Sequence, residues 1–173
     1  MIVEFDGYVP RVAETAFVAP TAVLIGNVVV EDEASIWYGA VLRGDHGEQA
    51  IVIGARSSVQ DNCVIHVAFD KGTTIGEDVT IGHGAILEAC EVGAGALVGM
   101  NTVVLEHARI GARVLVAANS TVLAHTEIPP DTLAAGSPAR VKKTIDGGAA
   151  WWIEHSAKYY VELSRKYKEQ GLE

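Results

Sequence analysis

The chain is short of cysteine, of aromatic residues and of disulfide motifs, and each shortage excludes a class of protein. Among 173 residues there are only two cysteines, Cys63 and Cys90, and they form no CxxC pair. A disulfide scaffold needs more, so we expect two small buried thiols in a reducing compartment. Aromatic residues make up only 6% of the chain although 49% of it is apolar. The core must therefore consist mainly of Val, Ile, Leu and Ala.

Long apolar runs and an excess of basic charge are also missing. The longest stretch without a charged residue, Val92 to Leu105, is too short and too rich in glycine to span a membrane. The first residues show no basic region followed by an apolar run, so we expect no secretory signal and a cytoplasmic protein. The net charge of −9 makes nucleic acid an improbable partner, because an acidic surface repels phosphate backbones.

What the chain has in abundance is a repeat of six residues. From Val92 onward an aliphatic residue recurs at every sixth position, and a small or β-branched residue follows four places later. The aliphatic members of this run are Val92, Val98, Val104, Ile110, Val116, Val122 and Ile128. The same period appears from Val18 to Leu42, from Ile53 to Ile65 and from Ile75 to Leu87. Six is neither the period of a helix nor that of an ordinary strand, so it indicates short strands joined by turns.

This repeat predicts an all-β solenoid. Three units of six residues close a triangular coil, in which one aliphatic side chain per unit points inward. Successive coils stack at the strand spacing of about 4.8 Å, and the length of the chain suggests about six coils. Glycine often directly follows the inward residue, as at Gly54 and Gly99, and we expect these glycines to serve tight corners that need permissive backbone angles.

The repeat is interrupted at three places and then ends, and the last interruption is a short step of five residues between Leu87 and Val92. Longer steps predict loops ejected from the coil at Arg43–Ala50 and His66–Thr74, and loops on a rigid scaffold often carry function. After two prolines the pattern stops, and Gly147–Gln170 shows helical spacing. We therefore expect a single domain, with a solenoid over residues 1–146 and a packed C-terminal helix over residues 147–173.

Candidate functional residues cluster at one corner of the expected coil. Arg43, His66 and Glu88 each directly follow an inward aliphatic residue, so they should stack in one column. His83 lies 17 positions after His66, which is about one coil. Two histidines and a carboxylate suit zinc, which accepts nitrogen and oxygen ligands. On spacing alone, these residues are equally well explained as ordinary polar residues on a surface corner.

Several motifs resemble the γ-class carbonic anhydrases and their close relatives. They are Arg43-Gly44-Asp45, Gln60-Asp61-Asn62, Val64-Ile65-His66 and Ile81-Gly82-His83-Gly84-Ala85-Ile86-Leu87. The stretches QDNCVIH and VGMNTVV resemble in particular the branch that contains phenylacetate-degradation and carnitine-operon proteins. The resemblance covers nearly the whole chain, whereas the six-residue rhythm alone is shared with many acyltransferases.

The resemblance implies a left-handed parallel β-helix with a C-terminal α-helix, assembled as a homotrimer. In the family, zinc, ferrous iron or cobalt is held at subunit interfaces and hydrates CO₂ to bicarbonate. His66 and His83 match two histidine ligands, and His83 would come from the neighbouring subunit. The third ligand departs from the pattern, because Glu88 stands where the family has histidine. A carboxylate makes the metal a weaker Lewis acid, so we expect weak activity, and Glu88 pairing with Arg43 would leave the site empty.

The same resemblance assigns roles around the expected metal. Arg43 and Asp45 would bridge subunits, Gln60 would hydrogen-bond the metal-bound water, and Asp61 would orient neighbouring groups. His46, in the first ejected loop, is the candidate proton carrier, since imidazole titrates near neutral pH. A solvated loop histidine remains the simpler interpretation of His46.

Two other functions stay open on the same fold. One is an acyltransferase or thioesterase linked to coenzyme A, for which Arg140, Lys142 and Lys143 form a small basic cluster. The other is a non-catalytic trimer that serves as an assembly or regulatory part. Glu88 favours this second alternative, while the intact Arg43 and His66 argue against it.

Overall fold

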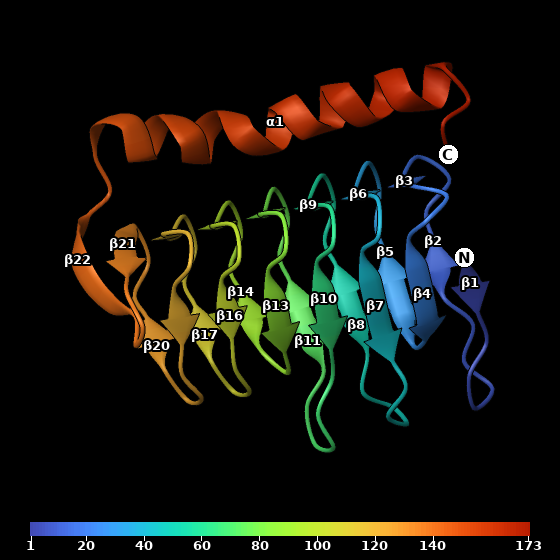
Figure 1. Cartoon of the computed structure of the whole chain (residues 1–173), viewed down its shortest axis with the longest axis horizontal. Coiled ribbons are helices and arrows are strands. Elements are labelled where there is room, and N and C mark those ends of the chain that lie inside the picture. The colour runs from blue at the N-terminus through green and yellow to red at the C-terminus, as the bar shows by residue number, and fades with distance from the viewer.

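A computed structural model describes all residues from Met1 to Glu173. It shows a β-solenoid of about seven turns with one helix, α1 (Gly147–Glu169), along its side (Figure 1). The expected left-handed β-helix of hexapeptide repeats is confirmed, and so is the C-terminal helix. No helix is both long enough and apolar enough to cross a membrane.

Three sheets form the sides of the solenoid, and strands pair in parallel from coil to coil. The first sheet consists of β1 (Ile2–Val3), β4 (Val23–Gly26), β7 (Val41–Gly44), β10 (Val64–His66), β13 (Ile86–Glu88), β16 (Val103–Val104) and β19 (Thr121–Val122). The second consists of β2 (Arg11–Val12), β5 (Val28–Val30), β8 (Ile51–Ile53), β11 (Thr73–Ile75), β14 (Glu91–Val92), β17 (Arg109–Ile110) and β20 (Glu127–Ile128). The third consists of β3 (Phe17–Val18), β6 (Ser35–Ile36), β9 (Ser58–Val59), β12 (Thr80–Ile81), β15 (Leu97–Val98), β18 (Leu115–Val116), β21 (Thr132–Ala135) and β22 (Arg140–Thr144).

The solenoid is one coil longer than the repeat indicates. Strands β1 and β2 precede Val18, the first residue of the recognisable pattern, and pair with β4 and β5. At the other end β22 turns back and pairs antiparallel with β21. Backbone pairing therefore extends the fold beyond the residues that carry the six-residue rhythm.

The core is the narrow interior of the coil. Every aliphatic residue of the repeat from Leu24 to Ile128 is buried, and Val18 alone is half-buried, at the edge of the pattern. Thirty-three buried residues form one continuous cluster. Because each coil adds three inward aliphatic side chains, burial of apolar area accumulates along the whole solenoid.

The glycines after the inward residues have a different role from the expected one. A Cβ atom on Gly99 would lie 2.5 Å from the backbone nitrogen of Ala118, and one on Gly54 would lie 2.5 Å from the carbonyl carbon of Gly76. Close approach of stacked coils therefore requires glycine there. The left-handed corner conformation is adopted instead by other residues, among them Asn62 (φ 59°).

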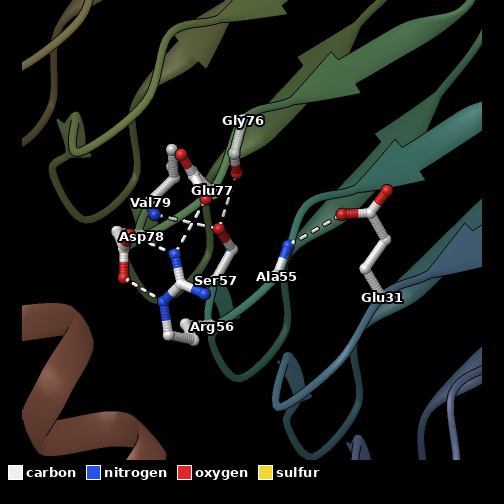
Figure 2. A network of polar contacts seen from close by, with 8 residues as sticks. All are labelled: Glu31, Ala55, Arg56, Ser57, Gly76, Glu77, Asp78 and Val79. Carbon is white, nitrogen blue, oxygen red and sulfur yellow. Dashed lines mark hydrogen bonds and ion pairs between the residues drawn. The ribbon is translucent and has the colours of Figure 1, made fainter.

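Polar side chains tie neighbouring coils together at one corner (Figure 2). Arg56 donates two hydrogen bonds of 2.7 Å to the carboxylate of Asp78 and one of 2.8 Å to Glu77. Ser57 donates to the carbonyl oxygen of Gly76 at 2.7 Å. The two carboxylates raise the pKa of the Arg56 guanidinium above its ordinary value. Arg56 and Asp78 form a bidentate ion pair. Such a pair is stronger than a surface ion pair with a single hydrogen bond.

The helix covers the third sheet, along which it runs (Figure 1). Phe17 and Trp37 are buried beneath it and make edge contacts with Tyr167, with ring centroids 5.7 and 5.2 Å apart. The hydroxyl groups of Thr80 and Ser156 form a buried hydrogen bond of 2.7 Å. The aromatic residues of α1 therefore pack in part on the chain's own solenoid.

Candidate functional site

Arg43, His66 and Glu88 form the predicted column. They occupy equivalent positions on adjacent strands β7, β10 and β13, with His66 in register with both neighbours. Their side chains point outward, because the residue before each one is buried in the core. The stacking that the spacing indicated is thus confirmed.

The column is bound together by carboxylates. His66 Nε2 lies 3.0 Å from Asp45 Oδ1, and His66 Nδ1 lies 3.3 Å from Glu88 Oε1. Arg43 donates to Asp45 Oδ2 at 2.5 Å and does not pair with Glu88. Although partial burial opposes ionisation, the hydrogen bonds from Arg43 and His66 hold the pKa of the Asp45 carboxyl below its ordinary value.

A second group of predicted residues assembles at another corner. His83 follows β12, and its Nδ1 lies 2.8 Å from Asp61 Oδ2. The backbone N–H of His83 donates to Gln60 Oε1 at 3.1 Å, and its carbonyl oxygen accepts from Asn101 N–H at 2.9 Å. These contacts fix the backbone on both sides and leave Nε2 as the ring nitrogen without a partner in the chain.

The single chain does not bring the three expected metal ligands together. Both ring nitrogens of His66 already contact carboxylates, and His83 pairs with Asp61 in the other group. No three His, Cys, Asp or Glu side chains are arranged to hold a metal ion. Zinc therefore gains no support from this geometry, and ligation by His66, His83 and Glu88 across subunits stays a prediction.

His46 directly follows Asp45 and is exposed on the first ejected loop. It forms a backbone bridge with Gln49, and its ring contacts Phe69 at a centroid distance of 5.0 Å. This contact joins the two ejected loops, which extend beyond the coil between β7 and β8 and between β10 and β11. A proton-carrying role for His46 stays a prediction.

A groove of about 300 Å³ lies between α1 and the solenoid, and His83 is one of the residues that line it. Its wall includes Gln60, Leu97, Met100, Trp152 and Tyr160. Burial, together with the neighbouring Tyr159 and Asp61, raises the pKa of the Tyr160 hydroxyl. The groove is mostly apolar, with a few polar side chains such as Gln60, His83 and Ser156, which is the usual composition of a small-molecule site.

The expected site residues did not include the apolar wall of this groove. Trp152 and Tyr160 are eight positions apart on the helix and share a face, so helical spacing was a usable signal. Leu97 directly precedes the inward Val98 and Met100 stands in the turn after it, so both look like ordinary outward positions of the repeat. A larger hollow of about 720 Å³ lies over the second sheet, but its rim is occupied by the ion pairs of Arg109 with Glu91 and Glu127.

Comparison with known proteins shows which family the chain resembles. A family model described as bacterial transferase hexapeptide (six repeats) matches residues 89–124. The carnitine operon protein CaiE of Escherichia coli O1:K1 is 42% identical over 159 residues, which cover 92% of this chain and 80% of CaiE. The resemblance to the carnitine-operon branch is therefore confirmed.

Solved structures agree with this. A putative acetyltransferase from Bacillus cereus superposes with a TM-score of 0.95 at 36% identity, over 98% of each chain. A hexapeptide-repeat acetyltransferase from Vibrio cholerae, complexed with acetyl coenzyme A, gives a TM-score of 0.52 at 28% identity. That match covers 61% of this chain and 66% of the other.

The prediction of carbonate dehydratase activity is wrong. The solved relatives are named as acetyltransferases, the matched repeat is that of transferases, and the CaiE proteins carry no lyase name. The physical reason is that one solenoid scaffold carries several chemistries, so the motifs specify the fold more strongly than the reaction. The motifs predicted the family correctly, but the reaction inferred from them was wrong.

Proposed function

Because the chain belongs to the hexapeptide-repeat family that includes the carnitine operon protein CaiE, we propose that it is an acyltransferase that uses coenzyme A thioesters. The observation that carries this proposal is the Asp61–His83 pair, whose histidine lines a mostly apolar groove. The names of the acetyltransferase relatives support it.

The pair is suited to general base catalysis. Asp61 holds Nδ1 of His83 at 2.8 Å, which orients the ring and favours the tautomer with the free lone pair on Nε2. Nε2 takes the proton from an acceptor hydroxyl or amine, and the acceptor attacks the thioester carbonyl. The carbon–sulfur bond breaks, the acyl group moves to the acceptor, and the coenzyme A thiolate leaves and takes up a proton. Gln60 keeps the His83 backbone in place throughout.

The groove and the strand beyond it suit the rest of an acyl-CoA. Its wall strands β12, β15 and β18 lead on to β21 and then to β22, which carries Arg140, Lys142 and Lys143. Four strand spacings of about 4.8 Å separate β12 from β22 by about 19 Å, a span that an extended pantetheine arm can cover. Lys143 is paired with Asp146 at 2.5 Å. The net charge of −9 opposes an anionic ligand at long range, so Arg140 and Lys142 supply the local attraction.

Self-association fits the outer face of the first sheet. An apolar stripe lies on this face beside the histidine column, our name for the stacked residues Arg43, His66 and Glu88. The stripe consists of four residues in register: Val41, Val64, Ile86 and Val103. Val64 and Ile86 are 40% and 47% exposed. Three copies closing a ring would cover this stripe, and we propose the homotrimer on that basis. A cytoplasmic location is proposed because both cysteines are free and buried.

The test is turnover of acetyl-CoA, followed by release of the free thiol, with a panel of small alcohols and amines. His83→Ala should lower kcat by about 10²- to 10⁴-fold, the usual contribution of a general base. Asp61→Asn should lower it less and leave KM nearly unchanged. His107→Ala is the matched control, because His107 lies at a corner outside the groove.

Binding separates the ligand from the chemistry. Coenzyme A should bind to His83→Ala as tightly as to the wild type, and it should bind more weakly to Lys142→Glu. The affinity of the wild-type protein for coenzyme A should fall as salt is added. A wild-type protein that neither binds coenzyme A nor cleaves acetyl-CoA with any acceptor would overturn the proposed function. Cleavage that needs no acceptor other than water would identify a thioesterase instead.

A further inference from the structure

The first half of α1 carries exposed aromatic side chains that the core does not use. Trp151, Trp152 and Tyr159 are 52%, 56% and 59% exposed, whereas the buried residues of α1 are small or aliphatic. Large aromatic groups gathered on one surface are uncommon unless the surface binds something. The groove proposed to hold the acyl-CoA, called the acyl groove below, is lined by Trp152 but not by Trp151 or Tyr159. It therefore does not account for the exposure of those two rings.

These side chains enclose a cavity of about 350 Å³. It is lined by Trp151, Trp152, His155, Ser156, Tyr159 and Tyr160. The two tryptophan rings stand at 84° to each other with centroids 5.0 Å apart, and the two tyrosine rings stand at 85° at 5.3 Å. Each pair forms an aromatic corner, and the two corners are separated by about two helical turns. His155 stacks on Trp151 between the two pairs, with ring centroids 4.6 Å apart, so the aromatic rings line one flank of the helix, which we call the aromatic box.

Two of the polar groups in the lining, those of Ser156 and His155, already have hydrogen-bond partners. Ser156 Oγ bonds to the hydroxyl of Thr80, and His155 Nδ1 lies 2.8 Å from the carbonyl oxygen of Trp151. No carboxylate or amide side chain lines the cavity. A primary ammonium would leave N–H donors without strong acceptors there, whereas a methylated ammonium has none to satisfy.

Charge favours a cation in this box. The faces of tryptophan and tyrosine attract cations, and quaternary ammonium groups are the ligands that aromatic boxes select. None of the lining residues is lysine or arginine, and the chain carries a net charge of −9. Asp61 acts electrostatically on Tyr160, so a carboxylate lies within reach of one wall.

We propose that this cavity binds the quaternary ammonium group of a small betaine- or choline-like cation. The cavity shares Trp152, Ser156 and Tyr160 with the acyl groove. A molecule held by its cationic head therefore extends along the groove toward His83. The binding itself does not depend on acyl transfer, and it is tested without reference to activity.

The experiment is ligand-detected NMR of the nine N-methyl protons of choline added to the purified full chain. The matched probe is 3,3-dimethylbutan-1-ol, a neutral molecule of the same shape with nine equivalent methyl protons. Choline should bind saturably and at least about tenfold more tightly than the alcohol, in keeping with cation–π energies of about 1–2 kcal/mol.

Variants locate the site. Trp151→Leu and Tyr159→Leu should each weaken choline binding by about threefold or more. Phe69→Leu is the control, since Phe69 is 80% exposed on a loop outside the cavity and its loss should change nothing. Equal binding of the neutral alcohol, or no saturable choline binding, would overturn the proposal. A fall in oligomer mass in Trp151→Leu without choline binding in the wild type would show that a second copy covers the rings.

Discussion

The hydroxyl oxygens of Thr80 and Ser156 meet at 2.7 Å, and this contact joins the solenoid to a helix residue 76 positions later in the chain. Both side chains are buried beneath α1. A hydroxyl left alone in such a place loses its partner and gains no water, which costs about 1–3 kcal/mol. The pair therefore fixes where the helix sits, and with it the groove and the aromatic cavity.

Ser156→Ala should lower the free energy of unfolding by about 1–3 kcal/mol, as measured by urea denaturation. The double variant Thr80→Val with Ser156→Ala should lose less than the sum of the single variants, because neither hydroxyl is then left unpaired. Ser137→Ala serves as the control, since its bond to Thr121 is exposed to solvent. Strict additivity of Thr80→Val and Ser156→Ala would contradict the coupling.

Two glycine substitutions should have opposite effects. In Gly99→Ala the new Cβ lies 2.5 Å from the Ala118 nitrogen, so two coils must separate and the protein should lose at least about 2 kcal/mol. In Gly148→Ala the Cβ meets nothing within 4 Å, and the helix should gain about 0.5 kcal/mol. Thermal unfolding of both variants checks this. A tolerated alanine at position 99 would mean that the coils are less tightly stacked than the structure indicates.

The fold was predictable because a six-residue period leaves few alternatives. The inward residues from Leu24 to Ile128 could be assigned by counting, and the same count aligned Arg43 with His66 and Glu88. The first coil was not predicted, since its strands are recruited by backbone pairing without the aliphatic rhythm. The sequence thus predicts which residues of the repeat point inward, but it does not predict which strands pair at the ends of the solenoid.

The site was predictable only in part. Counting cannot say that Asp61 turns toward His83, because partner choice depends on rotamers at a corner. Nor can it say that Gly99 is needed for coil-to-coil contact, which involves backbone 19 positions later, at Ala118. The reaction was assigned wrongly because one solenoid carries several chemistries, and the shared motifs specify the scaffold more strongly than the reaction.

Cys63 and Cys90 should resist alkylation in the native protein. Burial raises the pKa of each thiol to about 12, so only about one molecule in 10⁴ carries the thiolate at pH 8. Iodoacetamide should therefore modify neither residue at pH 8 and both in guanidinium, as mass spectrometry would record. The variant Ser137→Cys, with an exposed thiol, should react under native conditions. Rapid native labelling of Cys63 would mean that the solenoid opens readily at β10.

Asp45 should make the stability of the protein depend on pH. Its pKa is held below the ordinary value of about 3.9 in the folded state, so its contribution is complete above that value. The contribution disappears as the pH falls through the lower, folded pKa, because the protonated carboxyl no longer attracts Arg43. Asp45→Asn should therefore cost about 1 kcal/mol at pH 7, and this difference from the wild type should shrink below pH about 4.

Urea denaturation of both proteins between pH 3 and pH 7 measures the effect of Asp45→Asn. Glu48→Gln is the control in the same loop, because the Glu48 carboxylate makes no ion pair and its removal should leave the pH profile unchanged. Added salt should reduce the Asp45 contribution only partly, since the contact with His66 is half-buried, whereas the pair with Arg43 is exposed and is screened. If the difference in the free energy of unfolding between wild type and Asp45→Asn stayed constant down to pH 3, Asp45 would act through packing. The charge of Asp45 would then not be what holds Arg43 and His66 in place.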